Sequence, residues 1–104
     1  MINRNQPVAL TGTEYLIMEL LAEGRQKEMY GLELVEKSGG KLKRGTVYVL
    51  LGRLENKGLI EGRTVVEGSD IPRKVYRTTG LGQRVFRAWR SVAELGAFRG
   101  RAVA

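Results

Sequence analysis

The chain has 104 residues, of which 18 are Lys or Arg and 11 are Asp or Glu, so its formal charge is +7; it contains no histidine and no cysteine. This length suits a single domain, and an apolar fraction of 42% can form one modest core without disulfides or metal. The missing thiols and imidazoles exclude thiol nucleophiles, thiolate metal sites and histidine general bases. We therefore expect a protein that is not an enzyme and that uses no cofactor.

We expect no targeting signal at the beginning of this sequence. Residues 1–10 lack the basic start and the apolar stretch of a signal peptide. No run approaches the ~20 apolar residues of a membrane span. We therefore expect a cytoplasmic protein that makes no contact with a membrane.

Two helices are predicted in the first part of the chain. The motif Thr-Gly-Thr at residues 11–13, followed by Glu14, is typical of a helix start, because a Thr hydroxyl accepts from a free amide and an acidic side chain suits the positive helix end. The apolar run at residues 15–22 then predicts a buried helix. A second helix is predicted over residues 29–37, and the Ser-Gly-Gly sequence at residues 38–40 ends it.

The third predicted helix, residues 45–57, has the most regular pattern. Apolar residues recur at intervals of three and four and define an inner face: Val47, Leu50, Leu51 and Leu54, followed by Gly58. The opposite arc is small, polar or basic: Gly45, Thr46, Val49, Gly52, Arg53 and Asn56. One face of this helix is thus predicted to pack in the core, and the other is left for a partner.

A β-hairpin is predicted after the third helix. Residues 59–66 and 73–79 have strand-like composition, and residues 67–72 between them are rich in turn formers. Gly62 is a candidate for a β-bulge, which leaves the register of the hairpin open.

The helical period returns at Gly80, with one apolar stripe: Leu81, Val85, Ala88, Trp89, Val92 and Leu95. Three interpretations of this stripe are open, namely an intramolecular core, a dimer contact and a platform that stacks on an effector. We favour the dimer contact, because the first three helices can already close so small a core.

The order of elements predicts the fold. Three short helices, a two-stranded hairpin and a last helix indicate a mainly α protein with a winged helix-turn-helix. We expect a winged helix DNA-binding domain over residues 1–79 and a dimerisation helix with a tail over residues 80–104. In this architecture the third helix enters the major groove of DNA.

The charge is concentrated where that interface is expected. Residues 1–40 carry a net charge of −2, whereas residues 41–90 hold twelve basic and four acidic residues, a net charge of +8. Such a basic segment favours a polyanionic partner, here double-stranded DNA. The candidate DNA-binding residues are Lys41, Lys43, Arg44, Thr46, Tyr48, Val49, Arg53, Arg73 and Lys74.

Each candidate has a predicted role. Lys41 and Lys43, which precede the third helix, are assigned to phosphates. Four residues on its first turns and outer face are assigned to base edges: Arg44, Thr46, Val49 and Arg53. An Arg can pair with guanine O6 and N7, and the methyl groups of Thr and Val suit the thymine methyl. Tyr48 fits both a phosphate contact and plain packing, and Arg73 and Lys74 are assigned to the DNA backbone or minor groove beside the wing.

Three segments in order resemble the PadR-like transcriptional regulators. They are Tyr-Gly-Leu-Glu-Leu at residues 30–34, Gly-Thr-Val-Tyr at 45–48 with the run 51–60, and Arg-Lys-Val-Tyr-Arg-Thr-Thr-Gly at 73–80. Where the family often has a capping Ser followed by Pro, this chain has Lys43 and Arg44, which weakens the helix cap but adds positive charge.

The resemblance implies a homodimeric repressor of the short subfamily that dimerises through its last helix. We expect such a dimer to bind a pseudo-palindromic operator. The resemblance also implies a small aromatic or drug-like effector near the dimer interface, and Trp89 is the candidate effector-binding residue on that analogy alone. Two other interpretations remain: a winged helix that binds RNA, and a small adaptor that acts through protein contacts. RNA binding usually needs exposed aromatic side chains on which bases stack.

Overall fold

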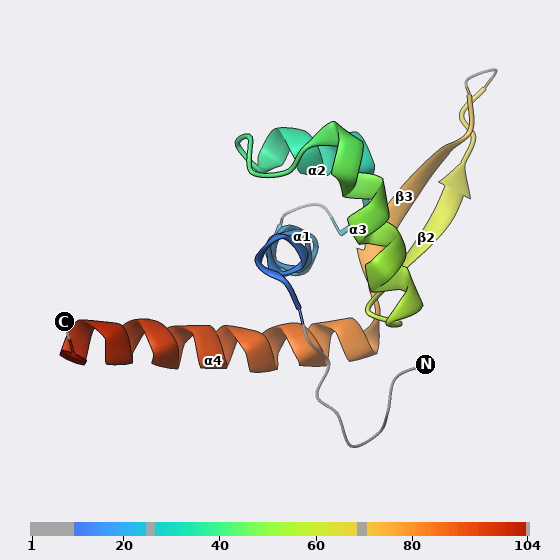
Figure 1. The fold of residues 1–104 in the computed structure, drawn as a ribbon. Helices are drawn as coiled ribbons and strands as arrows, with labels where there is room; N and C mark the ends of the chain where they lie inside the picture. Colours follow the sequence, from blue (N-terminus) through green and yellow to red (C-terminus); the bar gives the residue numbers. More distant parts are fainter. Residues whose placement is uncertain (1–9, 25–26, 69–70, 104) are drawn as a thin grey trace.

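The computed structural model describes residues 10–24, 27–68 and 71–103. Its elements are α1 (Gly12–Glu23), β1 (Met29–Tyr30), α2 (Gly31–Lys37), α3 (Arg44–Asn56), β2 (Ile60–Val65), β3 (Arg73–Thr78) and α4 (Gly80–Val103). In Figure 1, α1 to α3 form the body, the ribbon of β2 and β3 projects from it as a wing, and α4 extends far beyond the body. The fold is mainly helical with a small antiparallel sheet, as the sequence predicts.

The sheet has three strands in the order β1-β3-β2, so the predicted two-stranded hairpin gains a partner. Met29 pairs with Tyr76 and Tyr30 with Val75, both antiparallel. The prediction that the second helix begins at Met29 was wrong. Tyr30 has extended backbone angles, its N–H donates to the Glu33 carboxylate at 2.9 Å, and the helix begins at Gly31. The buried Met29 side chain reaches the core from a strand rather than from a helix.

The register of the wing is regular. Pairs run without interruption from Ile60 opposite Thr78 to Val65 opposite Arg73, with Gly62 opposite Tyr76. The prediction of a bulge at Gly62 was therefore wrong. Glycine at this position leaves room for the side chain of its neighbour Lys74. A Cβ at Gly62 would overlap Cε of Lys74 and lie 3.3 Å from its Cδ.

The core lies between α1, α3 and the sheet. The inner face predicted for α3 is confirmed, because Val47, Leu50, Leu51 and Leu54 are all buried. Phe86 of α4 is 2% exposed and belongs to the same core, and its ring lies 5.4 Å from that of Tyr15. The first turns of α4 therefore pack with the winged helix, through a residue that lies outside the predicted apolar stripe.

The start of α1 is capped as the sequence predicts. The N–H of Glu14 donates to the Thr11 hydroxyl at 3.1 Å, and the Thr11 N–H donates to the Glu14 carboxylate at 2.9 Å. Glu14 is only 1% exposed and pairs with Lys57, whose Nζ lies 3.0 Å away. Because Lys57 is the C-cap of α3, this pair joins the start of α1 to the end of α3.

Burial alone would raise the pKa of Glu14. The Thr11 N–H and the Lys57 ammonium outweigh this effect, so the pKa of Glu14 is lowered below its ordinary value. The carboxylate is therefore charged at neutral pH and holds Lys57 in place.

The first half of α4 is held against the body by close packing and by an ion pair. Gly82 lies directly on the backbone of Leu59, and a Cβ at Gly82 would overlap the carbonyl oxygen of Leu59. Further along, Arg90 forms ion pairs with Glu23 of α1 and with Glu94. Among the described residues, no helix is long and apolar enough to cross a membrane.

Candidate nucleic-acid interface

The outer face of α3 and the residues before it form an exposed surface. Lys43 is the N-cap of α3, and its side chain makes no capping hydrogen bond, as expected where a capping Ser is missing. Exposed side chains gather before the helix and along its outer arc: Lys41, Lys43, Arg44, Thr46, Tyr48, Val49 and Arg53. The core occupies the other face of the helix, so these side chains are available to a partner.

Some cations of the basic half have carboxylate partners and others have none. Within the described residues, no acidic side chain pairs with Lys41, Lys43, Arg44 or Arg53. Other cations have carboxylate partners: Lys57 with Glu14, Arg63 with Glu28, Lys74 with Glu55, Arg77 with Glu61, and Arg90 with Glu23. Arg73, Arg84 and Arg87 have no carboxylate partner among the described residues either, so the start and outer face of α3 hold four of the seven unpaired cations in the basic half.

Two glycines on the outer arc of α3 face open space. A Cβ at Gly45 or Gly52 would meet nothing within 4 Å. Packing within the chain therefore does not require glycine at either position, although glycine is a poor helix former. Both leave the backbone of α3 open to close approach from outside.

Tyr48 stands at the edge between α3 and α2, and 52% of it is exposed. Its ring rests on Gly31, where a Cβ would lie 2.7 Å from Cε1 and 3.0 Å from the hydroxyl oxygen of Tyr48. Tyr48, Tyr30, Pro72 and Arg73 also line a hollow of about 430 Å³ between α2 and the wing. The ring of Tyr48 thus packs on Gly31 while about half of the residue stays exposed, an arrangement that fits both plain packing and a phosphate contact.

The wing contributes Arg73 to the same hollow. Its guanidinium carbon lies 4.4 Å from the centroid of the Tyr30 ring, which is a cation-π arrangement. Stacking uses the flat face of the guanidinium and leaves its N–H groups free to donate in the plane. Local sequence does not predict the stack of Arg73 on Tyr30, because the contact depends on the pairing of β1 with β3.

Lys74, the other candidate on the wing, points toward Glu55 of α3. Its Nζ lies 3.1 and 3.2 Å from the two carboxylate oxygens of Glu55 on α3. The structure thus brings Tyr48 and Arg73 together beside α3, whereas the Lys74 ammonium already has a charged partner within the chain.

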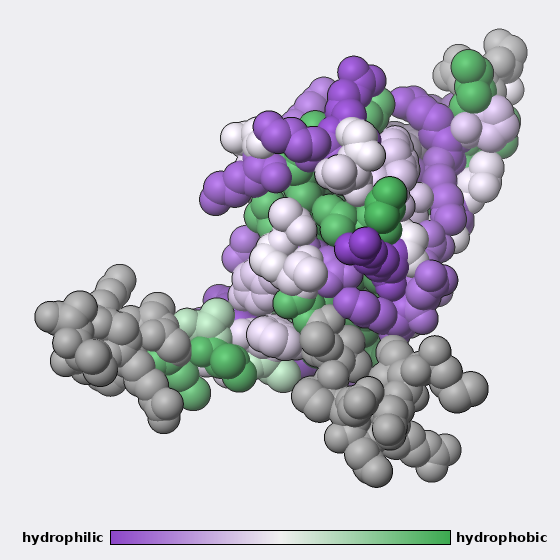
Figure 2. Space-filling model, viewed as in Figure 1, coloured by the Kyte–Doolittle hydropathy of each residue, from purple (hydrophilic) through white to green (hydrophobic). Residues whose placement is uncertain are grey.

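The apolar stripe predicted on α4 is divided between the body and the surface. Val85 packs against the core, and Trp89 is half-buried in a shallow hollow with Leu10, Tyr15 and Ala93. The rest of the stripe is exposed: Leu81, Ala88, Val92 and Leu95. Val92 and Leu95 are 59% and 60% exposed, and in Figure 2 the stretch of α4 next to the body is partly green.

A family model for PadR-like transcriptional regulators matches residues 17–88, which span α1 to the middle of α4. The chain belongs to the PadR-like family. Its members are transcriptional regulators, a class of proteins that are not enzymes. The matched region contains the whole exposed surface of α3 and the wing.

Solved structures of PadR-like proteins share the fold. A PadR-like transcription factor from Bacteroides fragilis is 26% identical, with a TM-score of 0.76, and the match covers 88% of this chain and 89% of that one. A PadR-family regulator from Eggerthella lenta is 34% identical, with a TM-score of 0.70 and coverage of 88% and 83%. Bacillus subtilis PadR in complex with operator DNA is 25% identical, with a TM-score of 0.68. That match covers 76% of this chain but only 47% of that one. No curated protein matches the chain significantly.

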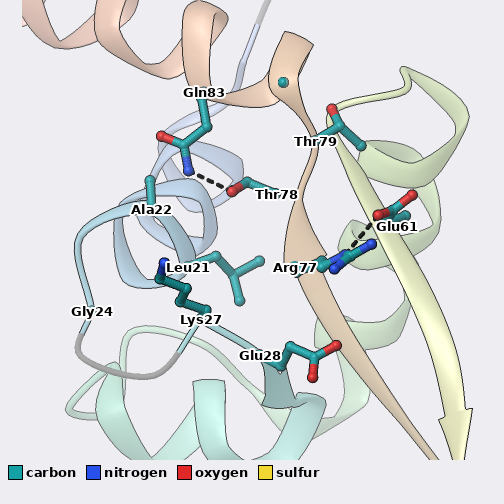
Figure 3. Close-up of a pocket in the computed structure, with 11 residues that line it drawn as sticks. Leu21, Ala22, Gly24, Lys27, Glu28, Glu61, Arg77, Thr78, Thr79 and Gln83 are labelled. Carbon is teal, nitrogen blue, oxygen red and sulfur yellow. Dashed lines mark hydrogen bonds and ion pairs between the residues drawn. The ribbon is translucent and has the colours of Figure 1, made fainter.

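A second hollow in this PadR-like chain, of about 760 Å³, lies where α1, the wing and the start of α4 meet (Figure 3). Two pairs of the polar groups drawn there bond to each other, since Gln83 donates to Thr78 and Arg77 to Glu61, both at 2.6 Å. Over the part of the chain described, no three acidic side chains gather as a metal site would require. The exposed surface of α3 therefore remains the better candidate for function.

Proposed function

We propose that this protein is a homodimeric DNA-binding repressor, which places α3 of each subunit in the major groove of a pseudo-palindromic operator. The observation that carries the proposal is the exposed surface of α3, where four cations without acidic partners surround an arc of small side chains. Such a surface releases counterions from DNA when it binds. The Bacillus subtilis relative in complex with operator DNA supports the same partner.

The proposed contacts follow the geometry of the helix. Lys41 and Lys43 bind phosphates, and so does the hydroxyl of Tyr48. The side chains that reach base edges are Arg44, Thr46, Val49 and Arg53. Arg73, which projects its N–H groups from the stack on Tyr30, binds the backbone or the minor groove beside the wing.

The proposed dimer forms through the exposed apolar part of α4. A two-fold arrangement of two α4 helices would bury Val92 and Leu95, which a monomer leaves more than half exposed. The two α3 helices would then meet successive major grooves about 34 Å apart on one side of the DNA.

The proposal includes release by a small aromatic effector that stacks on Trp89. Trp89 lies beside both α1 and the exposed stripe of α4, so a ligand there contacts the joint between the body and the proposed dimer helix. Such a ligand changes operator affinity only as far as it binds one dimer geometry better than the other.

The base-reading role of α3 is tested with Arg53→Ala and Lys43→Ala. Because Arg53 is proposed to read a base, its loss should cost about 1–3 kcal/mol of binding free energy and relax the preference at one position of the site. Lys43 is proposed to bind phosphate, so its loss should weaken binding to all duplex sequences alike and reduce the salt dependence of that binding. The measurement is a fluorescence anisotropy titration of a selected duplex and its single-base variants at several salt concentrations.

Lys27→Ala is a control that removes an exposed cation from the hollow between α1 and the start of α4, away from the proposed contacts, and it should leave the base preference unchanged. Equal and sequence-independent losses from Arg53→Ala and Lys43→Ala would contradict the assignment of Arg53 to a base edge.

The dimer is tested with the double variant Val92→Glu and Leu95→Glu. Both side chains are exposed in the monomer, so the variant should fold, but two carboxylates in the proposed interface should drive the sedimentation coefficient from dimer to monomer. Arg87→Glu places a carboxylate on a different face of α4 and should leave the dimer intact. A double variant that sediments as a dimer would move the interface away from this stripe.

A further inference from the structure

Lys74 links the wing to α3. Its Nζ lies within 3.2 Å of both carboxylate oxygens of Glu55, which is in the last turns of α3, and 19 positions separate the two residues in the chain. This ion pair connects the two elements that are proposed to contact DNA. Only about half of the Lys74 side chain is exposed.

The residues around Lys74 favour a side-chain conformation that reaches Glu55. Lys74 and Tyr76 share a face of β3, and Nζ lies 5.3 Å from the centroid of the buried Tyr76 ring. On the neighbouring strand, Gly62 leaves the space that the stem of Lys74 fills, since a Cβ there would overlap Cε. The hydrogen bond to Glu55 raises the pKa of Lys74, so the ammonium remains charged throughout the neutral range.

The outer part of the wing has few other supports. β1 pairs with β3 only at Tyr76 and Val75, so beyond these residues the wing is a ribbon of two strands. Two side chains of β3 connect this part of the ribbon to the body, one through β1 and one through α3. Arg73 stacks on Tyr30, and Lys74 pairs with Glu55.

We propose that Lys74 is a positioning residue of the DNA-binding surface, which acts through Glu55 to hold the wing at a fixed angle to α3. This inference rests on the proposed function. A helix and a wing that are fixed to each other meet DNA without first losing conformational freedom, which reduces the entropic cost of binding. Lys74 thus contributes to affinity although its charge is used within the protein.

The first test uses no DNA. The chain has no cysteine, so Asn56→Cys at the end of α3 and Glu67→Cys at the end of the wing allow two spin labels at exposed positions. Pulsed electron paramagnetic resonance should give a narrow distance distribution in this labelled protein. The distribution should broaden with Lys74→Gln or Glu55→Gln and should narrow again in the charge swap Lys74→Glu with Glu55→Lys.

The second test separates positioning from direct contact with phosphate. Glu55→Gln should weaken binding to a selected duplex about 2- to 5-fold, as expected from loss of an exposed ion pair. If Lys74 instead bound phosphate, Glu55→Gln would free its ammonium and tighten binding. Lys74→Gln should leave the slope of log K against log salt unchanged, whereas Arg73→Gln should reduce it by about 0.9.

Two results would overturn the positioning role. One is a distance distribution that neither single variant changes, and the other is tighter binding by Glu55→Gln together with a reduced salt slope for Lys74→Gln. Absence of duplex binding by the unaltered protein would refute the proposed function instead, and the distance measurement would still decide whether Lys74 fixes the wing.

Discussion

Replacing Gly82 with Ala should lower the free energy of unfolding by about 3 kcal/mol, because the added methyl group has no space. A Cβ at this position would overlap the carbonyl oxygen of Leu59 and lie 2.9 Å from its carbonyl carbon. Both atoms belong to the backbone, so a side-chain rotation cannot relieve the overlap. Either α4 or the segment between α3 and β2 must move, and the packing of Phe86 would be disturbed with it.

Gly80→Ala is the matched control, two residues earlier in the same turn. A Cβ at Gly80 would lie 3.8 Å from an Arg84 nitrogen, which is an ordinary contact. The free energy of unfolding should therefore change by less than about 0.5 kcal/mol. Urea denaturation followed by circular dichroism measures both variants. Equal stabilities of the two variants would contradict the close contact between α4 and Leu59.

Glu14→Gln should cost about 2 kcal/mol of stability at neutral pH. Glutamine can still accept from the Thr11 N–H, but it cannot balance the charge of Lys57, and the site is almost completely buried. Glu36→Gln, which replaces an exposed carboxylate on α2, should change stability by less than about 0.5 kcal/mol. Urea denaturation at pH 7 gives both values.

The effect of Glu14 should depend on pH with a definite sign. Since the pKa of Glu14 is lowered in the folded protein, its contribution is present above the ordinary Glu pKa of about 4.3 and is lost as the pH falls through the lower folded pKa. The stability difference between the unaltered protein and Glu14→Gln should therefore shrink on acidification. A difference that stays constant would show that the loss comes from packing rather than from charge.

Local pattern was enough to predict the helices and the inner face of α3. The period of Val47, Leu50, Leu51 and Leu54 places them on one side of a helix whatever surrounds it, and the structure buries all four. By contrast, Met29 and Tyr30 fit a helical pattern but form a strand, because β3 offers hydrogen bonds that no local pattern records. Phe86 was missed because its burial depends on how α4 docks onto α1.

In the candidate site too, local pattern predicts some features, whereas others depend on contacts between residues far apart in the chain. Exposure of Lys43, Arg44 and Arg53 follows from the period of α3 and its flanking residues, so sequence alone could predict it. The stack of Arg73 on Tyr30 and the pairing of Lys74 with Glu55 join residues that are far apart in the chain. A count of charges cannot separate free cations from paired ones, and the pairing of Lys74 with Glu55 is visible only in the structure.

The most direct test of the central proposal is selection of bound DNA from a pool of random duplexes. The account predicts an enriched consensus with two-fold symmetry and half-sites about one helical turn apart, because two α3 helices read it from one side. Selection with Arg53→Ala should relax one position in each half-site. Recovery of no consensus, or of the same consensus with both proteins, would contradict sequence recognition by the outer face of α3.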